Sequence, residues 1–150
     1  MFVHKEIKLS EKVVLFCHIS PDLKNNKCKN KKVKFDDYTF HSQAEAKHYQ
    51  HTLKPKFEKG IISHLEVHPR ITCMVNNVKV CVYIADFSYI DQEELTPLGA
   101  VGCLVYEDVK GFKTDVYKLK KKLVEACYKG TKVVEIDPKL YKNVELILDA

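Results

Sequence analysis

The chain has 150 residues, of which 45% are hydrophobic and 30% are charged. This length suits one domain with its own core and is short for two. No apolar run reaches the roughly 20 residues that a membrane-spanning helix needs, and the N-terminal residues lack the apolar segment and cleavage site of a secretory signal. We therefore expect a domain that works in the cytoplasm and has no membrane partner.

The positive charge is unevenly distributed. The net charge of +5 arises from 25 Lys and Arg residues against 20 Asp and Glu residues. Much of the excess lies in the stretches KNNKCKNKKVK and KGFKTDVYKLKKK. Such clustering indicates a polyanionic partner such as nucleic acid. The alternative is a set of ordinary solvated lysines.

Six cysteines are scattered along the chain without a CxxC pair, and most of them lie in apolar runs. This distribution favours buried, reduced thiols over a disulfide framework. The alternative is a structural zinc site. Its candidate ligands are His64, His68, Cys73 and Cys81.

The N-terminal part divides into a short leading segment and the start of the main domain. Residues 1–30 contain one expected strand, at 12–20, followed by a polar, basic loop. Residues 31–150 form the single domain. It opens with an alternating segment at 32–40 around an Asp-Asp pair, which predicts a short hairpin.

The segment 41–60 is the first clear helix. Ser42 and Glu45 form an S-x-x-E capping box at its start, and Gly60 closes it. Pro55 lies inside the segment, so the regular helix must end near residue 53 or kink there.

Three antiparallel strands are expected next. The segments 61–75 and 78–90 are rich in β-branched and aromatic residues, and Asn76-Asn77 between them predicts a tight turn. A further strand follows at 100–109 after a polar loop.

The C-terminal part adds a helix and a strand. Thr114 is the expected N-cap of a helix over 114–130, and its apolar stripe contains Val116, Leu119, Leu123 and Cys127. A strand at 132–136 follows, and Asp137-Pro138 can start a short terminal helix. The element order predicts a mixed α/β domain with a central sheet flanked by helices.

Asp86 lies in the middle of the apolar stretch YIADFSYI. Strand alternation places Asp86 on one face with Ile84 and Ser88, and both faces are largely apolar. A carboxylate in such a central strand needs a cation, a metal ion or several hydrogen-bond donors. A salt bridge to a nearby lysine is the simplest alternative.

The stretch LVYEDVKG carries two adjacent acids and a lysine. By the same alternation Asp108 and Lys110 share a face, whereas Glu107 points to the other face and is expected to be a solvated acid. A supporting role beside the site, or one facing nucleic acid, is the alternative for Glu107. If this strand pairs with the Asp86 strand, the two aspartates can meet around a divalent cation such as Mg²⁺. Lys110 could then contact a phosphate, or position and deprotonate a water. The alternative is a charged turn at a strand end.

Glu45 supplies a third acid. It can serve only as the capping-box acid, but it also heads an i, i+4 row with Tyr49 and Leu53 that faces the sheet. A helix acid, a mid-strand Asp and a later Asp-x-Lys in this order are more specific than any one of them.

These stretches together resemble the PD-(D/E)xK nuclease superfamily. The segments FHSQAEAKHY, GIISHLEVHPRI, YIADFSYI and VYEDVKGF are similar to those of its small phage-encoded members, and the resemblance covers about residues 32–136. It implies a restriction-endonuclease-like αβββαβ core. It also implies that Asp86 and Asp108 bind Mg²⁺ or Mn²⁺, that Lys110 is catalytic, and that Glu45 completes the catalytic and metal site.

Two positions depart from the family pattern. Ala85 stands before Asp86, where the superfamily has Pro. This replacement of Pro by Ala is common in the branch that the chain resembles. His68 stands where many relatives have Gln. If that position lines the site, His68 joins the catalytic residues by contacting the scissile phosphate or the attacking water. Otherwise it is an ordinary surface or core histidine.

The resemblance implies a metal-dependent endonuclease that acts on duplex or branched DNA, in phage recombination, replication or packaging, in the host cytoplasm. A homodimer is expected because cutting two strands needs two sites. Alternatives are an exonuclease or single-strand or RNA nuclease, and a non-cleaving module that binds nucleic acid or a host protein. The lysines expected to grip backbone phosphates, if they are more than a solvated face, are Lys113, Lys118, Lys120, Lys121 and Lys122.

Overall fold

The structure is a computed structural model that describes residues 30–95 and 101–147. The strand expected at 12–20, and most of the basic loop after it, lie outside the described residues. The described chain begins with a hairpin of β1 (Val33–Phe35) and β2 (Tyr38–Phe40). Its turn residues Asp36 and Asp37 have φ values of 47° and 63°, which matches the tight two-residue turns of β-hairpins. The predicted hairpin is therefore confirmed.

The first helical segment is continuous but changes its winding. It consists of α2 (Gln43–His48), the π-helical turn η1 (Tyr49–Leu53) and α3 (Lys54–Glu58). Pro55 lies in the first turn of α3, where the missing N–H of a proline costs little. The wide π turn thus lets the chain stay helical past Pro55, and the regular α-helix ends five residues before the position expected from the proline.

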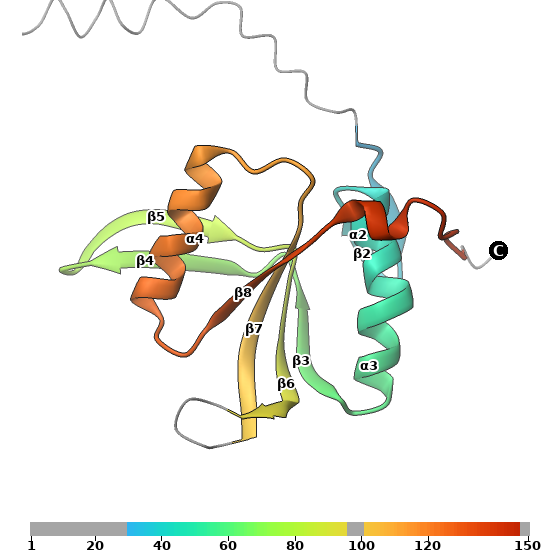
Figure 1. Cartoon of the computed structure of the whole chain (residues 1–150), viewed down its shortest axis with the longest axis horizontal. Coiled ribbons are helices and arrows are strands. Elements are labelled where there is room, and N and C mark those ends of the chain that lie inside the picture. The colour runs from blue at the N-terminus through green and yellow to red at the C-terminus, as the bar shows by residue number, and fades with distance from the viewer. Residues whose placement is uncertain (1–29, 96–100, 148–150) are drawn as a thin grey trace, which may run out of the picture.

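The central sheet has four strands in the order β3-β6-β7-β8 (Figure 1). Its bounds are β3 (Ile62–Val67), β6 (Phe87–Leu95), β7 (Val101–Val109) and β8 (Lys132–Ile136). The β3–β6 and β6–β7 pairings are antiparallel, and β8 runs parallel to β7. A crossover between parallel strands needs a long connection, and α4 (Asp115–Cys127) supplies it.

The two long strands expected at 61–75 and 78–90 are each broken into two. The second half of the first and the first half of the second form a separate hairpin, β4 (Arg70–Val75) and β5 (Val78–Ile84), around the predicted Asn76-Asn77 turn. The breaks lie side by side. The His68 N–H donates to the Asp86 carbonyl at 2.9 Å, and the Ala85 N–H donates to the Pro69 carbonyl at 3.3 Å. Pro69 has no N–H to continue a ladder, so the chain leaves the sheet there.

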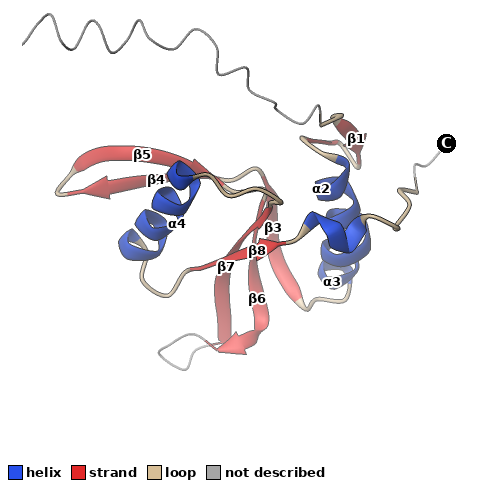
Figure 2. Cartoon of the chain, turned by 45° about the horizontal axis from the view of Figure 1, so that its top comes forward, coloured by secondary structure: helices blue, strands red, loops and turns tan. Residues whose placement is uncertain are grey.

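Two hydrophobic cores lie on opposite faces of β7, because successive strand residues alternate in direction. Val105 and Val109 pack with α2 and η1 in one core, while Tyr106 packs with the core between α4 and the β4–β5 hairpin. Figure 2 shows α2 and α3 on one side of the sheet and α4 with β4 and β5 on the other. The expected mixed α/β domain with a central sheet flanked by helices is confirmed.

Helix α4 turns a different face toward the core from the one that the expected apolar stripe predicts. Tyr117 and Val124 are its buried residues, whereas Val116 and Leu119 are 64% and 60% exposed. The helix turns this way because the Tyr117 ring packs near Tyr83 of the β4–β5 hairpin and beneath the Lys110 ammonium. Only the C-terminal half of the stripe, Leu123 and Cys127, faces the core as predicted.

The last helical element of the described residues is a short 3₁₀ helix, η2 (Pro138–Tyr141), whose N-cap Asp137 accepts a hydrogen bond from the Lys139 N–H. This confirms the helix start expected at Asp137-Pro138. Among the described residues, no helix has the length and apolar character needed to cross a membrane.

Candidate active site

Lys110 stands at the end of β7, where its backbone N–H donates to the Ile136 carbonyl at 3.0 Å. Its Nζ donates a 2.8 Å hydrogen bond to Oδ1 of Asp108 and lies 4.9 Å from the centre of the Tyr117 ring. Burial by itself lowers the pKa of this ammonium, but the hydrogen bond and charge of Asp108 and the charges of Asp86 and Glu45 outweigh it, so the pKa of Lys110 is raised. Lys110 is therefore a firmly held cation.

Asp108 is completely buried on the α4 face of β7. Burial raises the pKa of its carboxyl, and the Lys110 hydrogen bond opposes that rise. Its second oxygen, Oδ2, has no hydrogen-bond partner within the described ranges. The Tyr117 hydroxyl is near enough to lower the pKa of Asp108, yet no hydrogen bond of acceptable geometry joins them. A buried carboxylate oxygen without a donor is costly, and a bound water, a bound ion or a catalytic role would account for it.

Asp86 lies at the break between β5 and β6, one residue before the Phe87–Glu107 pair. Its Oδ2 accepts a 2.8 Å hydrogen bond from the Val109 N–H. Burial and the charge of Glu45 raise the pKa of Asp86, while Lys110, the Val109 N–H and His68 act in the opposite direction. Asp86 therefore lies just before the start of β6, next to the end of β7 that carries Asp108. The Val109 N–H donates to Asp86, whereas the Lys110 ammonium donates to Asp108.

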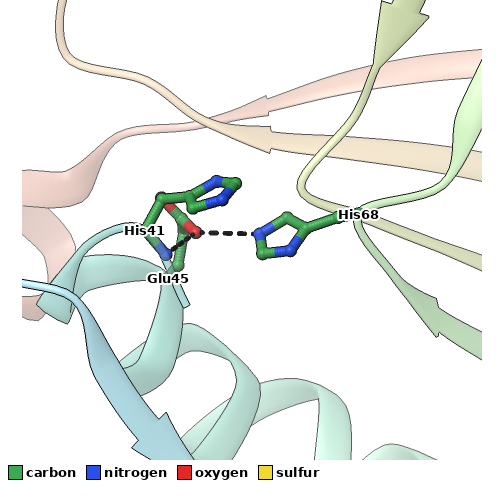
Figure 3. Close-up of side chains that lie close together, drawn as sticks. All are labelled: His41, Glu45 and His68. Carbon is green, nitrogen blue, oxygen red and sulfur yellow. Dashed lines mark hydrogen bonds and ion pairs between the residues drawn. The ribbon is translucent and has the colours of Figure 1, made fainter. Parts of the chain in front are cut away.

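Glu45 is buried at the start of α2 and is fixed by the predicted capping box. Its Oε1 accepts from the Ser42 hydroxyl at 2.9 Å, and its Oε2 accepts from the His41 N–H at 2.9 Å. The same Oε2 lies 3.4 Å from Nε2 of His68, and the His41 and His68 rings stack with centres 4.0 Å apart (Figure 3). Sequence reasoning missed His41, although it directly precedes the capping serine.

Lys110 interacts with all three acids that the sequence predicts for the site. Its ammonium is hydrogen-bonded to Asp108 and interacts through charge with Asp86 and Glu45. Asp86 in turn interacts with both Glu45 and His68. Lys110 thus links two sets of expected residues near the start of β6 and the end of β7: Asp108 through a hydrogen bond, and Asp86 with Glu45 and His68 through charge. Within the described residues Asp86, Asp108 and Glu45 do not bring their oxygens together as one group of metal ligands, so a cation among them would require their side chains to move. The arrangement as it stands offers the fixed positive charge of Lys110 to an anion.

Glu107 has a different role from the one expected. It is 5% exposed rather than solvated, because alternation on β7 turns it toward α2 and the first core. Its carboxylate accepts from Tyr89 at 2.7 Å and lies 2.5 Å from Nε2 of His48. His48 continues through Nδ1 to the Tyr141 hydroxyl at 2.6 Å. This buried chain of polar contacts fastens the 3₁₀ helix η2 to α2, away from Asp108.

The lysines expected to contact DNA differ in their surroundings. Lys113 and Lys121 both pair with Glu135, Lys121 at 3.3 Å. Their charges lower the pKa of Glu135, led by the hydrogen bond from Lys113. Lys118 pairs with Asp115, and Lys120 donates to the Val82 carbonyl. Lys122 is exposed.

A pocket of about 230 Å³ opens directly beside Lys110. Lys110, Lys113 and Lys139 line it, together with the acids Glu135 and Asp137. Three ammonium groups beside the candidate site provide a surface on which an anionic chain could lie.

The described cysteines are free thiols, as expected: Cys73 and Cys103 are buried, and Cys81 and Cys127 are partly buried. Cys73 pairs across the hairpin with Cys81 and lies near Cys127 of α4. His68 instead lies beside Glu45 and His41. The zinc site considered from the sequence is therefore not assembled.

The fold and site define a small mixed α/β domain with a buried group of acids around one lysine. Residues 25–143 match the family model DUF1064, described as a protein of unknown function, and the chain belongs to this family. No curated protein and no solved structure matches the chain.

Proposed function

We propose that the chain is a metal-dependent DNA endonuclease of the PD-(D/E)xK superfamily, similar to its small phage-encoded members. The observation that carries the proposal is the position of Lys110, which is hydrogen-bonded to Asp108 and within the electrostatic reach of Asp86 and Glu45. The sequence resemblance implies this constellation: a lysine that interacts with two acids at neighbouring strand ends and with a third acid on the first helix.

The element order supports the same proposal. A helical segment is followed by three antiparallel strands, a helix and a parallel strand, with the β4–β5 hairpin between the first and second strands of the sheet. This order agrees with the restriction-endonuclease-like αβββαβ core that the resemblance implies, and that core is part of the proposal. The candidate residues come from the first helix and from the ends of its second and third strands, β6 and β7.

The acids suit a hard divalent cation such as Mg²⁺ or Mn²⁺, which prefers carboxylate oxygens and water. Two features favour such an ion: Oδ2 of Asp108 is buried without a donor among the described residues, and burial, followed by the charge of Glu45, raises the pKa of Asp86. Asp86 and Asp108, with Glu45, would hold it. When bound, the ion would supply positive charge that offsets the charge developing on the phosphate in the transition state.

The chain's own residues would bind and orient the DNA. Lys110 would pair with an oxygen of the scissile phosphate or position the attacking water, while its hydrogen bond to Asp108 fixes its direction. Lys113 and Lys139, on the same pocket, would bind neighbouring backbone phosphates without reading base sequence. His68, beside Glu45 and near Asp86, would contact the phosphate or the water from the other side.

The proposed substrate is duplex or branched DNA in the host cytoplasm, with a task in recombination, replication or packaging. Contacts to backbone phosphates alone favour recognition of DNA shape rather than of a long sequence. A homodimer would supply the second site that a double-strand cut needs.

The test is to incubate the purified protein with circular duplex, end-labelled linear duplex and four-way junction DNA, each with Mg²⁺ or Mn²⁺. We expect cleavage of circular or branched DNA that Asp86→Ala and Lys110→Ala abolish. The matched control is Lys129→Ala, which removes an exposed lysine outside the site. Products released only from labelled ends would replace the proposal with an exonuclease. Binding without cleavage under every condition would replace it with a non-cleaving DNA-binding module.

A further inference from the structure

His41, Glu45 and His68 form a group of potential metal ligands. One ligand atom from each of these three residues lies within 4.8 Å of the other two (Figure 3). They come from the loop after β2, the first turn of α2, and the corner between β3 and β4. We propose that His41, Glu45 and His68 bind a divalent first-row transition-metal ion.

The carboxylate of this group is preorganised. The capping box fixes Glu45, since Oε1 accepts from Ser42 and Oε2 accepts from the His41 N–H. Oε2 is also the atom that lies 3.4 Å from Nε2 of His68. A metal ion between those two atoms would replace a weak contact with two coordinate bonds of roughly 2.0–2.2 Å.

His68 is held in place by an unusual backbone. It has a φ of 55°, which is uncommon for a residue with a side chain, and its N–H donates to the Asp86 carbonyl at 2.9 Å. Backbone conformations of this kind cost free energy and are often kept at sites where a side chain must be aimed. Here the conformation directs the imidazole toward Glu45.

His41 provides the adjustable ligand. It is exposed, and its ring stacks on the ring of His68 at an interplanar angle of 17°. Convergence of both imidazoles on one ion requires the His41 ring to turn out of this stack. Because the side chain is exposed, the turn meets little packing resistance.

The donor set selects the class of ion. Two imidazoles and one carboxylate suit Zn²⁺, Co²⁺ and related ions, and Zn²⁺ sites with two His and one Glu keep an open coordination position. Mg²⁺ prefers oxygen ligands and water, so it should not compete effectively for this group. The inferred site therefore differs in ion preference from the acidic site proposed around Asp86 and Asp108, with which it shares Glu45.

The experiment is a Co²⁺ titration of the tag-free, chelator-treated full chain in excess Mg²⁺, followed by visible absorption. Nitrogen and oxygen ligands give visible bands, whereas thiolate ligands add an intense near-ultraviolet band that reports separately on the cysteines. We expect His68→Ala to weaken the visible-band binding by at least the roughly 10- to 100-fold that loss of an outer metal partner costs. The exposed His41→Ala should weaken it similarly without disturbing the fold.

His64→Ala is the matched control, because His64 also has a positive φ, of 52°, but lies outside the group. Circular dichroism spectra of the variants, compared with the wild type, would check that each variant is folded. Equal titrations for His64→Ala and His68→Ala would overturn the inference, as would loss of the wild-type band in excess Mg²⁺. Loss of the band in Asp86→Asn to the same extent as in His68→Ala would assign the ion to the acidic site instead. The proposed nuclease is tested separately, since its failure to cleave DNA leaves the Co²⁺ titration unchanged.

Discussion

Asp108 lies on β7 and Lys110 directly follows that strand, and a 2.8 Å hydrogen bond from the lysine Nζ to Oδ1 joins them. The pair lies on the α4 face, above the Tyr117 ring. It satisfies one oxygen of a fully buried carboxylate and leaves the other without a donor in the described chain. Lys110 is the cation that offsets this buried charge, so we expect the pair to contribute to stability, which can be measured in the absence of any substrate.

The first prediction concerns this pair. Lys110→Met should lower the free energy of unfolding, because it leaves the buried Asp108 carboxylate without its cation. The loss should be somewhat smaller than the roughly 3–5 kcal/mol of a fully buried pair, since the Lys110 side chain is 31% exposed. Urea denaturation of the metal-free protein measures it. The double variant Asp108→Asn, Lys110→Met should be more stable than Lys110→Met, because the unpaired charge is gone. A double variant less stable than both single variants would contradict this account.

Local sequence signals predicted much of the fold. Ser42 and Glu45 marked a helix start, and the hydrogen bonds of a capping box are present there. The Asn76-Asn77 turn forms with φ values of 48° and 62°, which Asn tolerates better than most residues. These features depend on residues close in sequence, so a single sequence contains the information. The alternation that separated Glu107 from Asp108 and Lys110 on β7 also holds, because that strand is unbroken.

The features that were missed depend on tertiary contacts. The breaks at His68 and Asp86 are joined by hydrogen bonds between two chain segments, and alternation within one segment cannot reveal them. The same holds for Glu107, whose burial is made possible by His48 and Tyr89 from other elements. His41 joins the site because of a fold that brings the β3–β4 corner next to α2. Only its position before the capping serine was visible in the sequence.

The second prediction tests the buried polar chain that ends at Tyr141. Tyr141→Phe removes the hydroxyl that contacts His48 at 2.6 Å and Thr52 at 2.9 Å. At about 0.5–1.5 kcal/mol for each hydrogen bond, the free energy of unfolding should fall by about 1–3 kcal/mol. Thermal and urea unfolding measure the change. Tyr38→Phe is the control, because Tyr38 is itself exposed. Identical unfolding midpoints for the two variants would show that the chain of contacts does not stabilise the protein.

The third prediction concerns the pH dependence of Cys73. Burial, followed by the neighbouring Cys81 and Cys127, raises the pKa of its thiol from 9.0 to about 11. The thiolate is the reactive form, so at pH 8 only roughly one molecule in a thousand would carry it at Cys73. Alkylation followed by peptide mass spectrometry should find Cys73 slower than the partly buried Cys81, with a rate that rises with pH up to about 11.

The same shift affects stability. In the unfolded chain the Cys73 thiol ionises near its usual pKa of 9.0, before it does so in the folded protein. Because the pKa is raised in the folded state, this contribution to stability is fully present below the unfolded-state value of 9.0. It is lost as the pH rises from there toward about 11. Cys73→Ala should flatten this loss in urea denaturation between the two pH values. An unchanged slope would contradict the assignment.

The last prediction concerns the lysines that Glu135 holds. Lys113 and Lys121 both pair with this carboxylate, which also lines the pocket beside Lys110. In a nuclease, a DNA phosphate would have to compete with Glu135 for the two ammonium groups. Glu135→Gln should therefore tighten binding of duplex DNA and steepen its salt dependence, because more lysine charge is free to replace counterions on the phosphates. Fluorescence anisotropy at several salt concentrations measures both quantities. Glu125→Gln is the matched control, since it removes the same charge from an exposed position on α4. Equal tightening by both variants would show that net charge alone acts, and that Glu135 does not restrain the two lysines.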